Sequence, residues 1–106
     1  MNSIQLPGYA MSTSTSSMVW LEGEANYTRV HYHDGTTSLV TKPLNHFEQY
    51  GHFLRVHRSI MVNSVYVHEF IHNKGRSGLL QLITGVKVPV SRTHLSVVSG
   101  LFGVRL

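Results

Sequence analysis

The sequence predicts a mostly β fold, in which packed antiparallel β-sheets are accompanied by one or two short helices. Short runs of apolar and β-branched residues recur along the chain, and the run over residues 27–33 alternates as a half-buried strand does. Turn-forming pairs separate these runs, and Asp34-Gly35 is the strongest hairpin signal among them. Helix starts are indicated at only two places, Pro43 and Ser91.

Each element follows from a local signal, taken in chain order. Pro7-Gly8 would end a first edge strand, and Gly51 suits the position just after a helix. Thr84-Gly85 would turn one strand into the next. The expected strands are 4–6, 18–22, 27–33, 36–41, 53–56, 65–71, 79–83 and 86–90, with a turn at 73–78, and the expected helices are 42–51 and 91–101.

The first part of the chain differs from the rest. Residues 12–17 are all serine or threonine, which is typical of a polar loop or linker. The whole chain of 106 residues suffices for one small domain with a modest core. We therefore expect an N-terminal extension or linker over residues 1–17, and one domain over residues 18–106.

Composition points to a polyanionic partner. Nine Lys and Arg exceed five Asp and Glu, which gives a formal net charge of +4. The chain has no cysteine, which excludes disulfides and Cys-based zinc sites and fits a reducing cytoplasm. No apolar run approaches the ~20 residues that span a bilayer, and no signal-peptide pattern is visible. We expect a cytoplasmic protein with no membrane association.

Catalysis has little support in the sequence. Asp34 is the only aspartate and lies in a predicted turn, and Glu22 and Glu24 are the only carboxylates close together. Nucleophile-elbow and phosphate-binding glycine motifs are missing. We expect no enzymatic activity, no cofactor and no small-molecule substrate.

Two apolar runs end in polar clusters that contain arginine. Residues 53–56 are followed by His57-Arg58-Ser59, and residues 88–90 by Ser91 and Arg92. A strand would hold each run in the core and present its arginine at the end of a rigid element. A guanidinium group can bind a phosphate, or the N7 and O6 acceptors of guanine. Both clusters therefore indicate nucleic-acid binding.

Seven motifs occur in a fixed order along the chain. They are Trp20-Leu21-Glu22-Gly23, Asn26-Tyr27-Thr28, Asp34-Gly35, Lys42-Pro43-Leu44, Phe53 to Ser59, Val62-Asn63 and Val88-Pro89-Val90-Ser91-Arg92. This ordered set resembles the LytTR domain, the DNA-binding output domain of a class of bacterial response regulators. The resemblance implies packed antiparallel sheets with a short helix, and inter-strand loops that enter the major groove of duplex DNA. It also implies tandem copies on imperfect direct repeats and a homodimer that forms on DNA.

The resemblance also implies the DNA-contacting residues. Base reading and phosphate contact fall on Asn26, Thr28, Arg58 and Arg92, and weaker candidates for phosphate contact are Lys42, Ser91 and Arg29. Residues 1–17 match the start of the family domain poorly, and the sequence does not include the receiver domain that often precedes this domain in the family. The sequence leaves open whether the chain is an isolated output domain or a stand-alone regulator.

Other roles are open for several of these residues. Arg92 could be a solvated cation, although its charge opposes the dipole at a helix start. Arg58 could pair with Glu69, and Thr28 could simply fill a strand. His57 is better explained as a hydrogen-bonded structural residue than as a base reader.

Two further alternatives concern aromatic rings. His31 and His33 share a strand face at a spacing that can chelate a metal, but a tight four-ligand motif is missing, so we expect no metal site. A single-stranded nucleic-acid module could stack bases on Tyr27, Tyr32 and Trp20, although the latter two suit the core. The third ligand of a metal site at His31 and His33 would have to come from His46, His52, His68, His72 or His94.

Asn63 is expected to cap a turn.

Overall fold

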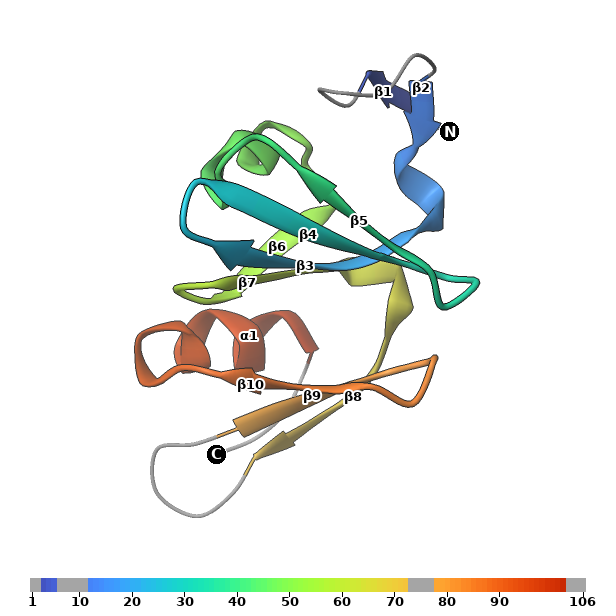
Figure 1. Ribbon diagram of the computed structural model, residues 1–106. Coiled ribbons are helices and arrows are strands. Elements are labelled where there is room, and N and C mark those ends of the chain that lie inside the picture. The colour runs from blue at the N-terminus through green and yellow to red at the C-terminus, as the bar shows by residue number, and fades with distance from the viewer. Residues whose placement is uncertain (1–2, 6–11, 73–77, 103–106) are drawn as a thin grey trace.

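The body of the molecule consists of two packed antiparallel sheets and one C-terminal α-helix (Figure 1). The computed structural model describes residues 3–5, 12–72 and 78–102. The larger sheet has the strand order β5-β4-β3-β7-β6, and the smaller has the order β10-β9-β8. The strands are β1 (Ser3–Gln5), β2 (Ser12–Ser14), β3 (Met18–Glu24), β4 (Tyr27–Tyr32), β5 (Thr37–Val40), β6 (Phe53–His57), β7 (Ile60–Asn63), β8 (Val67–His72), β9 (Gly78–Leu82) and β10 (Lys87–Val90). The helices are α1 (Leu95–Phe102) and the short 3-10 helices η1 (Thr15–Ser17), η2 (Leu44–Gln49), η3 (Ser64–Tyr66) and η4 (Arg92–His94).

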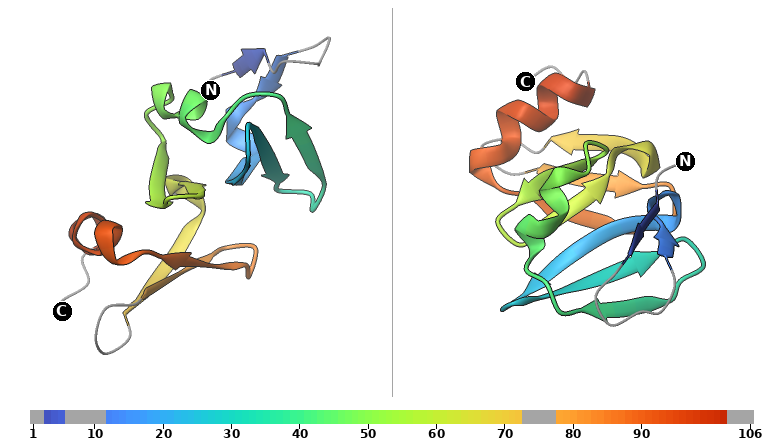
Figure 2. Two further views of the ribbon diagram at one scale, coloured as in Figure 1. Left: turned by 60° about the vertical axis from the view of Figure 1, so that its left-hand side comes forward. Right: turned by 90° about the horizontal axis from the view of Figure 1, so that it is seen from above.

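The predicted fold class is confirmed, and most predicted strands are present within a few residues. Gly35 and Gly85 adopt φ values of 89° and 93°, which the predicted hairpin turns require. Residues 73–77 of the predicted third turn lie outside the described residues. Strands β1 and β2 form a hairpin of their own, which stands apart from α1 in both views of Figure 2.

Strand β7 was not predicted. Its residues Ile60–Asn63 are all buried, so the strand has no polar face and lacks the alternation that marks a half-buried strand. It pairs with both β3 and β6, which makes the preceding residues Arg58 and Ser59 a two-residue hairpin turn. The polar interruption seen in the sequence is therefore the tip of a β-ribbon.

Both predicted helices are shorter or more irregular than expected. The segment expected as a helix over residues 42–51 is the 3-10 helix η2, and Pro43 precedes it instead of occupying its first turn. The segment expected as a helix over 91–101 is divided into η4 and α1. Ser91 has the N-cap position of η4, but its hydroxyl makes no capping hydrogen bond.

Hydrophobic cores lie on both faces of the larger sheet. One core fills the space between the two sheets and α1, and a second lies between the larger sheet and η2. A β-bulge at the start of β3 shifts its alternation, so that Val19 enters the first core and Leu21 the second. The first core includes Val19, Val56, Val62, Leu80, Leu82, Val88 and Val98, and the second includes Met18, Leu21, Val30, Val40, Phe47, Phe53 and Met61.

Asn63 joins the start of the domain to the connection between the sheets. Its buried side-chain amide donates to the carbonyls of Thr15 at 3.3 Å and Met18 at 3.0 Å. Its oxygen accepts from the Val65 amide at 3.2 Å, which confirms the predicted turn cap. The Tyr66 hydroxyl also donates to the Ser16 carbonyl. Residues 15–17, expected within a linker, are thus bonded to the domain.

We expect Asn63→Ala to lower the free energy of unfolding by about 2–3 kcal/mol, because it leaves buried backbone groups without partners. Chemical denaturation monitored by tryptophan fluorescence would measure this change. Asn45→Ala on the exposed surface of η2 is the matched control, and should stay within about 0.5 kcal/mol of the parent. Equal stability of the two variants would show that the Asn63 hydrogen bonds are not important for folding.

Candidate nucleic-acid interface

Four connections meet at one end of the larger sheet, on the left in Figure 1. Strands β3, β5 and β6 end here and β4 and β7 begin here, because neighbouring strands are antiparallel. We call this region the loop edge. It comprises the β3–β4 turn (residues 25–26), the β5–η2 connection (41–43), the β6–β7 turn (58–59) and the β10–α1 connection (91–94).

Three hydrogen bonds each join one of these connections to a neighbouring strand. The amide of Gly23 donates to the carbonyl of Ser59 at 2.8 Å. The amide of Ser91 donates to the carbonyl of Val56 at 2.9 Å, which places the β10–α1 connection beside the end of β6. The Thr28 hydroxyl donates to the Lys42 carbonyl at 2.8 Å. Segments far apart in the sequence are thereby fixed at one edge.

Arg58 and Arg92, the two predicted base readers, are both exposed at the loop edge. Arg58 lies at the tip of the β6–β7 ribbon, and Arg92 follows Ser91 at the start of η4. Within the described part of the chain neither arginine forms an ion pair, so the alternative pairing of Arg58 with Glu69 is not seen. Both guanidinium groups are therefore available to an external anion.

Arg55 holds the β6–β7 turn in place. Its Nη1 donates to the Arg58 carbonyl at 2.7 Å, and its Nη2 donates to Glu48 Oε2 in η2 at 3.3 Å. Sequence reasoning missed this role, because a cation within a strand looks like an ordinary solvated residue. The only available signal was its position three residues before Arg58.

Thr28 does not fit its predicted contact with DNA. Its side chain is fully buried and its hydroxyl is bonded to the Lys42 carbonyl. Its side chain therefore supports the connection that contains Lys42 and does not face solvent. Lys42 and Asn26 are both exposed, and Asn26 lies in a tight turn in which Ala25 has a positive φ of 55°.

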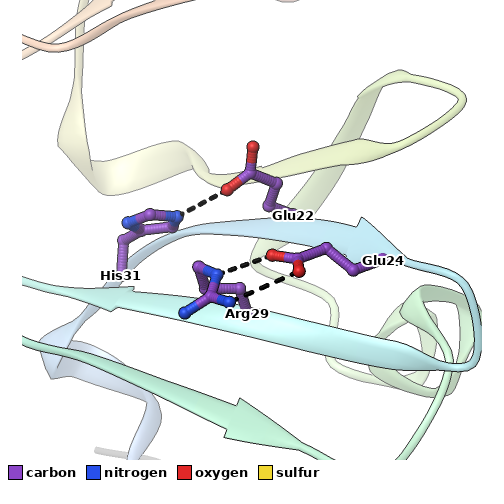
Figure 3. Close-up of polar contacts among 4 residues, drawn as sticks. All are labelled: Glu22, Glu24, Arg29 and His31. Carbon is purple, nitrogen blue, oxygen red and sulfur yellow. Dashed lines mark hydrogen bonds and ion pairs between the residues drawn. The ribbon is translucent and has the colours of Figure 1, made fainter.

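Arg29 is engaged by Glu24 (Figure 3). Arg29 Nε lies 2.6 Å from Glu24 Oε2, and Arg29 Nη2 lies 3.3 Å from Glu24 Oε1. The hydrogen bond from Arg29 lowers the pKa of Glu24, and the same bond raises the pKa of Arg29. The predicted phosphate contact by Arg29 thus has an internal competitor. The sequence did not reveal it, because Arg29 lies opposite Glu22 in the hairpin and reaches Glu24 diagonally.

His31 is also occupied within the protein. Its Nε2 lies 3.0 Å from Glu22 Oε1, and its ring stacks on Trp20 with centroids 3.9 Å apart (Figure 3 shows the Glu22 contact). His33 lies in the β4–β5 turn, beyond the end of the strand that was expected to align the two rings. No three His, Asp or Glu side chains converge on a possible metal position within residues 3–5, 12–72 and 78–102.

Ser91 is half-buried and its side chain contacts its own turn. Its Oγ lies 2.6 Å from His94 Nδ1 and 3.2 Å from Thr93 Oγ1. The residue therefore shapes the β10–α1 connection through both its backbone amide and its hydroxyl. Its predicted contact with phosphate stays a prediction.

The aromatic residues do not form an exposed stacking row. Trp20 is stacked on His31, and Tyr32 is partly buried with its hydroxyl accepting from Ser38 at 2.7 Å. Of the three rings considered for base stacking, only Tyr27 is substantially exposed, at 44%. This arrangement gives little support to a single-stranded nucleic-acid module.

Comparison with known proteins agrees with this geometry. A family model described as the LytTr DNA-binding domain matches residues 10–103. The chain belongs to this family. A solved structure, the LytTr DNA-binding domain of a putative methyl-accepting/DNA response regulator from Bacillus cereus, superimposes with a TM-score of 0.81 at 25% identity, over 98% of this chain and 99% of that one.

A curated relative extends the comparison to a whole regulator. The CO-responsive transcriptional regulator RcoM of Rhodospirillum rubrum is 32% identical over 94 residues. The match covers 85% of this chain but 39% of RcoM, so the chain corresponds to well under half of that protein. The family is one of DNA-binding domains and not of enzymes. In the described parts of the chain, no helix is long and apolar enough to cross a membrane.

The burial of Thr28 generates a test of its role. We expect Thr28→Val to lower the free energy of unfolding by about 1–2 kcal/mol, since the Lys42 carbonyl loses its partner. Base preference should be unchanged. Thr37→Val on the exposed edge strand β5 is the control, and both variants can be compared by thermal melts and DNA titrations. Normal stability with altered preference at one base pair would restore Thr28 as a reader.

Proposed function

We propose that this domain binds duplex DNA sequence-specifically, as a bacterial transcriptional regulator or its output domain in the cytoplasm. The loop edge carries the proposal. It presents Arg58, Arg92 and Lys42 as exposed cations, none of which forms an ion pair with a described residue. Hydrogen bonds between these connections and the neighbouring strands hold the cations at one edge, where their charge suits the polyanionic backbone of a duplex.

The shape of the edge favours major-groove reading. The major groove is about 12 Å wide and admits a two-stranded β-ribbon. The β6–β7 ribbon has Arg58 in its two-residue tip, and Arg55 fixes the tip carbonyl. A guanidinium group held at this position can donate two parallel hydrogen bonds to guanine O6 and N7. Arg92 is placed beside this ribbon by the bond between Ser91 and Val56.

The remaining contacts are assigned to the DNA backbone. Lys42 supplies a point charge to phosphate, and Asn26 and Ser91 supply neutral polar groups near it. Arg29 would contact the DNA backbone only after it breaks its ion pair with Glu24 and binds a phosphate instead. We further propose that two copies bind imperfect direct repeats and form a homodimer on DNA, with residues 1–17 as an extension to the domain of residues 18–106.

The proposed function predicts different effects for residues that contact bases and residues that contact phosphates. Arg58→Ala and Arg92→Ala should each cost roughly 1–3 kcal/mol on the preferred duplex and relax preference at one base pair. Lysine at either position should rescue little, because it lacks the planar fork. Lys42→Ala should weaken all duplexes equally and reduce the salt slope by about 0.9. The operator for these titrations would come from sequencing duplexes retained by the purified domain.

Lys87→Ala is the matched control for these variants. Lys87 is an exposed cation at the first residue of β10, at the opposite end of that strand from Ser91. Its removal should leave both preference and affinity nearly unchanged. If the parent domain retained all duplexes equally, or bound single strands more tightly than duplexes, the proposed function would be wrong.

A second prediction concerns Glu24. Glu24→Gln should release Arg29 and remove a negative charge from the loop edge, so affinity should rise for every duplex and the salt slope should steepen. Specificity, measured as the ratio of preferred to random duplex affinity, should fall. Glu69→Gln on the exposed surface of β8 is the control for a general change in net charge. Equal gains in the two variants would show that Glu24 has no special relation to the DNA surface.

A further inference from the structure

The β6–β7 turn fixes the position of a proton on His57. The Ser59 backbone amide donates to His57 Nδ1 at 3.2 Å, and the Ser59 hydroxyl lies 3.1 Å from the same nitrogen. A backbone N–H can only donate, so Nδ1 must be unprotonated to accept from it. The single proton of the neutral imidazole is therefore on Nε2.

The other ring nitrogen is available at the loop edge. His57 is half-buried and is the last residue of β6, directly before Arg58. Two buried polar atoms lack partners among the described residues, namely His52 Nε2 and Arg55 Nε, and His57 Nε2 is not one of them. No described residue bonds to His57 Nε2, so its N–H is a donor without an acceptor in the described part of the chain.

We propose that His57 donates its Nε2–H to a phosphate of the DNA backbone, as an uncharged ring. The inference rests on the proposed function and adds a contact that the sequence did not assign. A single N–H lacks the paired donors that distinguish one base from another, whereas phosphate oxygens accept from single donors. The same tautomer then serves both contacts, because Nδ1 accepts from the Ser59 amide and Nε2–H donates to DNA.

The neutral state of the ring has a measurable consequence. The Ser59 amide donates to Nδ1, so the geometry of the turn corresponds to a ring whose proton is on Nε2. An uncharged donor neutralises no phosphate and releases no condensed counterion. Loss of His57 should therefore lower affinity without changing its salt dependence, in contrast to loss of Lys42.

His94 on the neighbouring connection does not carry the same inference. Its Nδ1 lies 2.6 Å from the Ser91 hydroxyl, which can either donate or accept. The proton position on that ring is therefore not determined by its partner, and His94 has no part in the proposal.

Two substitutions at His57 separate the two nitrogens. His57→Asn retains an oxygen that can accept from the Ser59 amide but has no donor at the Nε2 position. His57→Gln places an amide donor near the Nε2 position, but it has no acceptor at the Nδ1 position for the Ser59 amide. His68→Asn, at an exposed position on β8 in the smaller sheet, is the matched control. Binding to preferred and random duplexes is measured well below the lowest melting temperature, so that every variant is folded.

We expect His57→Asn to melt close to the parent and to bind every duplex roughly tenfold more weakly, with an unchanged salt slope. His57→Gln should melt at a lower temperature yet bind more tightly than His57→Asn. His68→Asn should match the parent in both measurements. Imidazole ¹⁵N chemical shifts should show an unprotonated Nδ1 in the free domain and in the complex.

Three results would overturn the inference. If His57→Asn bound DNA with the affinity of the parent, His57 would have only a structural role in the β6–β7 turn. A salt slope reduced by about 0.9, as for Lys42→Ala, would mean that the ring is charged on DNA. Relaxed preference at a single base pair would mean a base contact instead of a phosphate contact. A parent domain that binds no duplex would instead refute the proposed function itself.

Discussion

Burial of the larger sheet on both faces is the constraint on which the rest of the structure depends. Strands β3 and β7 lie at its centre, and their side chains enter both cores. Neither strand can slip by one residue without moving apolar side chains out of one core and into the other. This fixed register determines where each strand ends, and so it determines the positions of the connections at the loop edge.

The loop edge depends on hydrogen bonds that tie its connections to the neighbouring strands more than on any one sequence motif. Gly23 is bonded to the β6–β7 turn, and Ser91 to the end of β6, through backbone groups whose partners are independent of side-chain identity. Arg55 adds a side-chain bond to the same turn. The exposed cations thus stand on a supported edge, in keeping with the rule that recognition residues lie on loops positioned by a rigid scaffold.

Sequence patterns predicted elements whose signals are local. The alternation in β4 and the glycine turns at positions 35 and 85 depend on near neighbours, and so they could be read directly. Strand β7 was missed because burial on both faces removes alternation. Length and flanking turns would have been the better guide to such a strand.

The sequence predicted that two arginines of the candidate site lie at strand ends, but it did not predict the side-chain contacts within the site. The motifs placed Arg58 and Arg92 at strand ends, and the structure brings those ends together through Ser91 and Val56. Whether a polar side chain faces solvent or a backbone carbonyl depends on packing between distant segments. For this reason Thr28, expected at the DNA surface, proved to be buried.

The attachment of residues 15–17 through Asn63 has a mechanical consequence. Residue 15 is tied in just before β3 begins, and β3 ends at the loop edge. If the loop edge is anchored, a pull from the N-terminal side acts along β3, at right angles to the ladder bonds that join it to β4 and β7. Those bonds would then be loaded together in shear and would not open one after another, so the central strand is suited to resist tension applied from upstream.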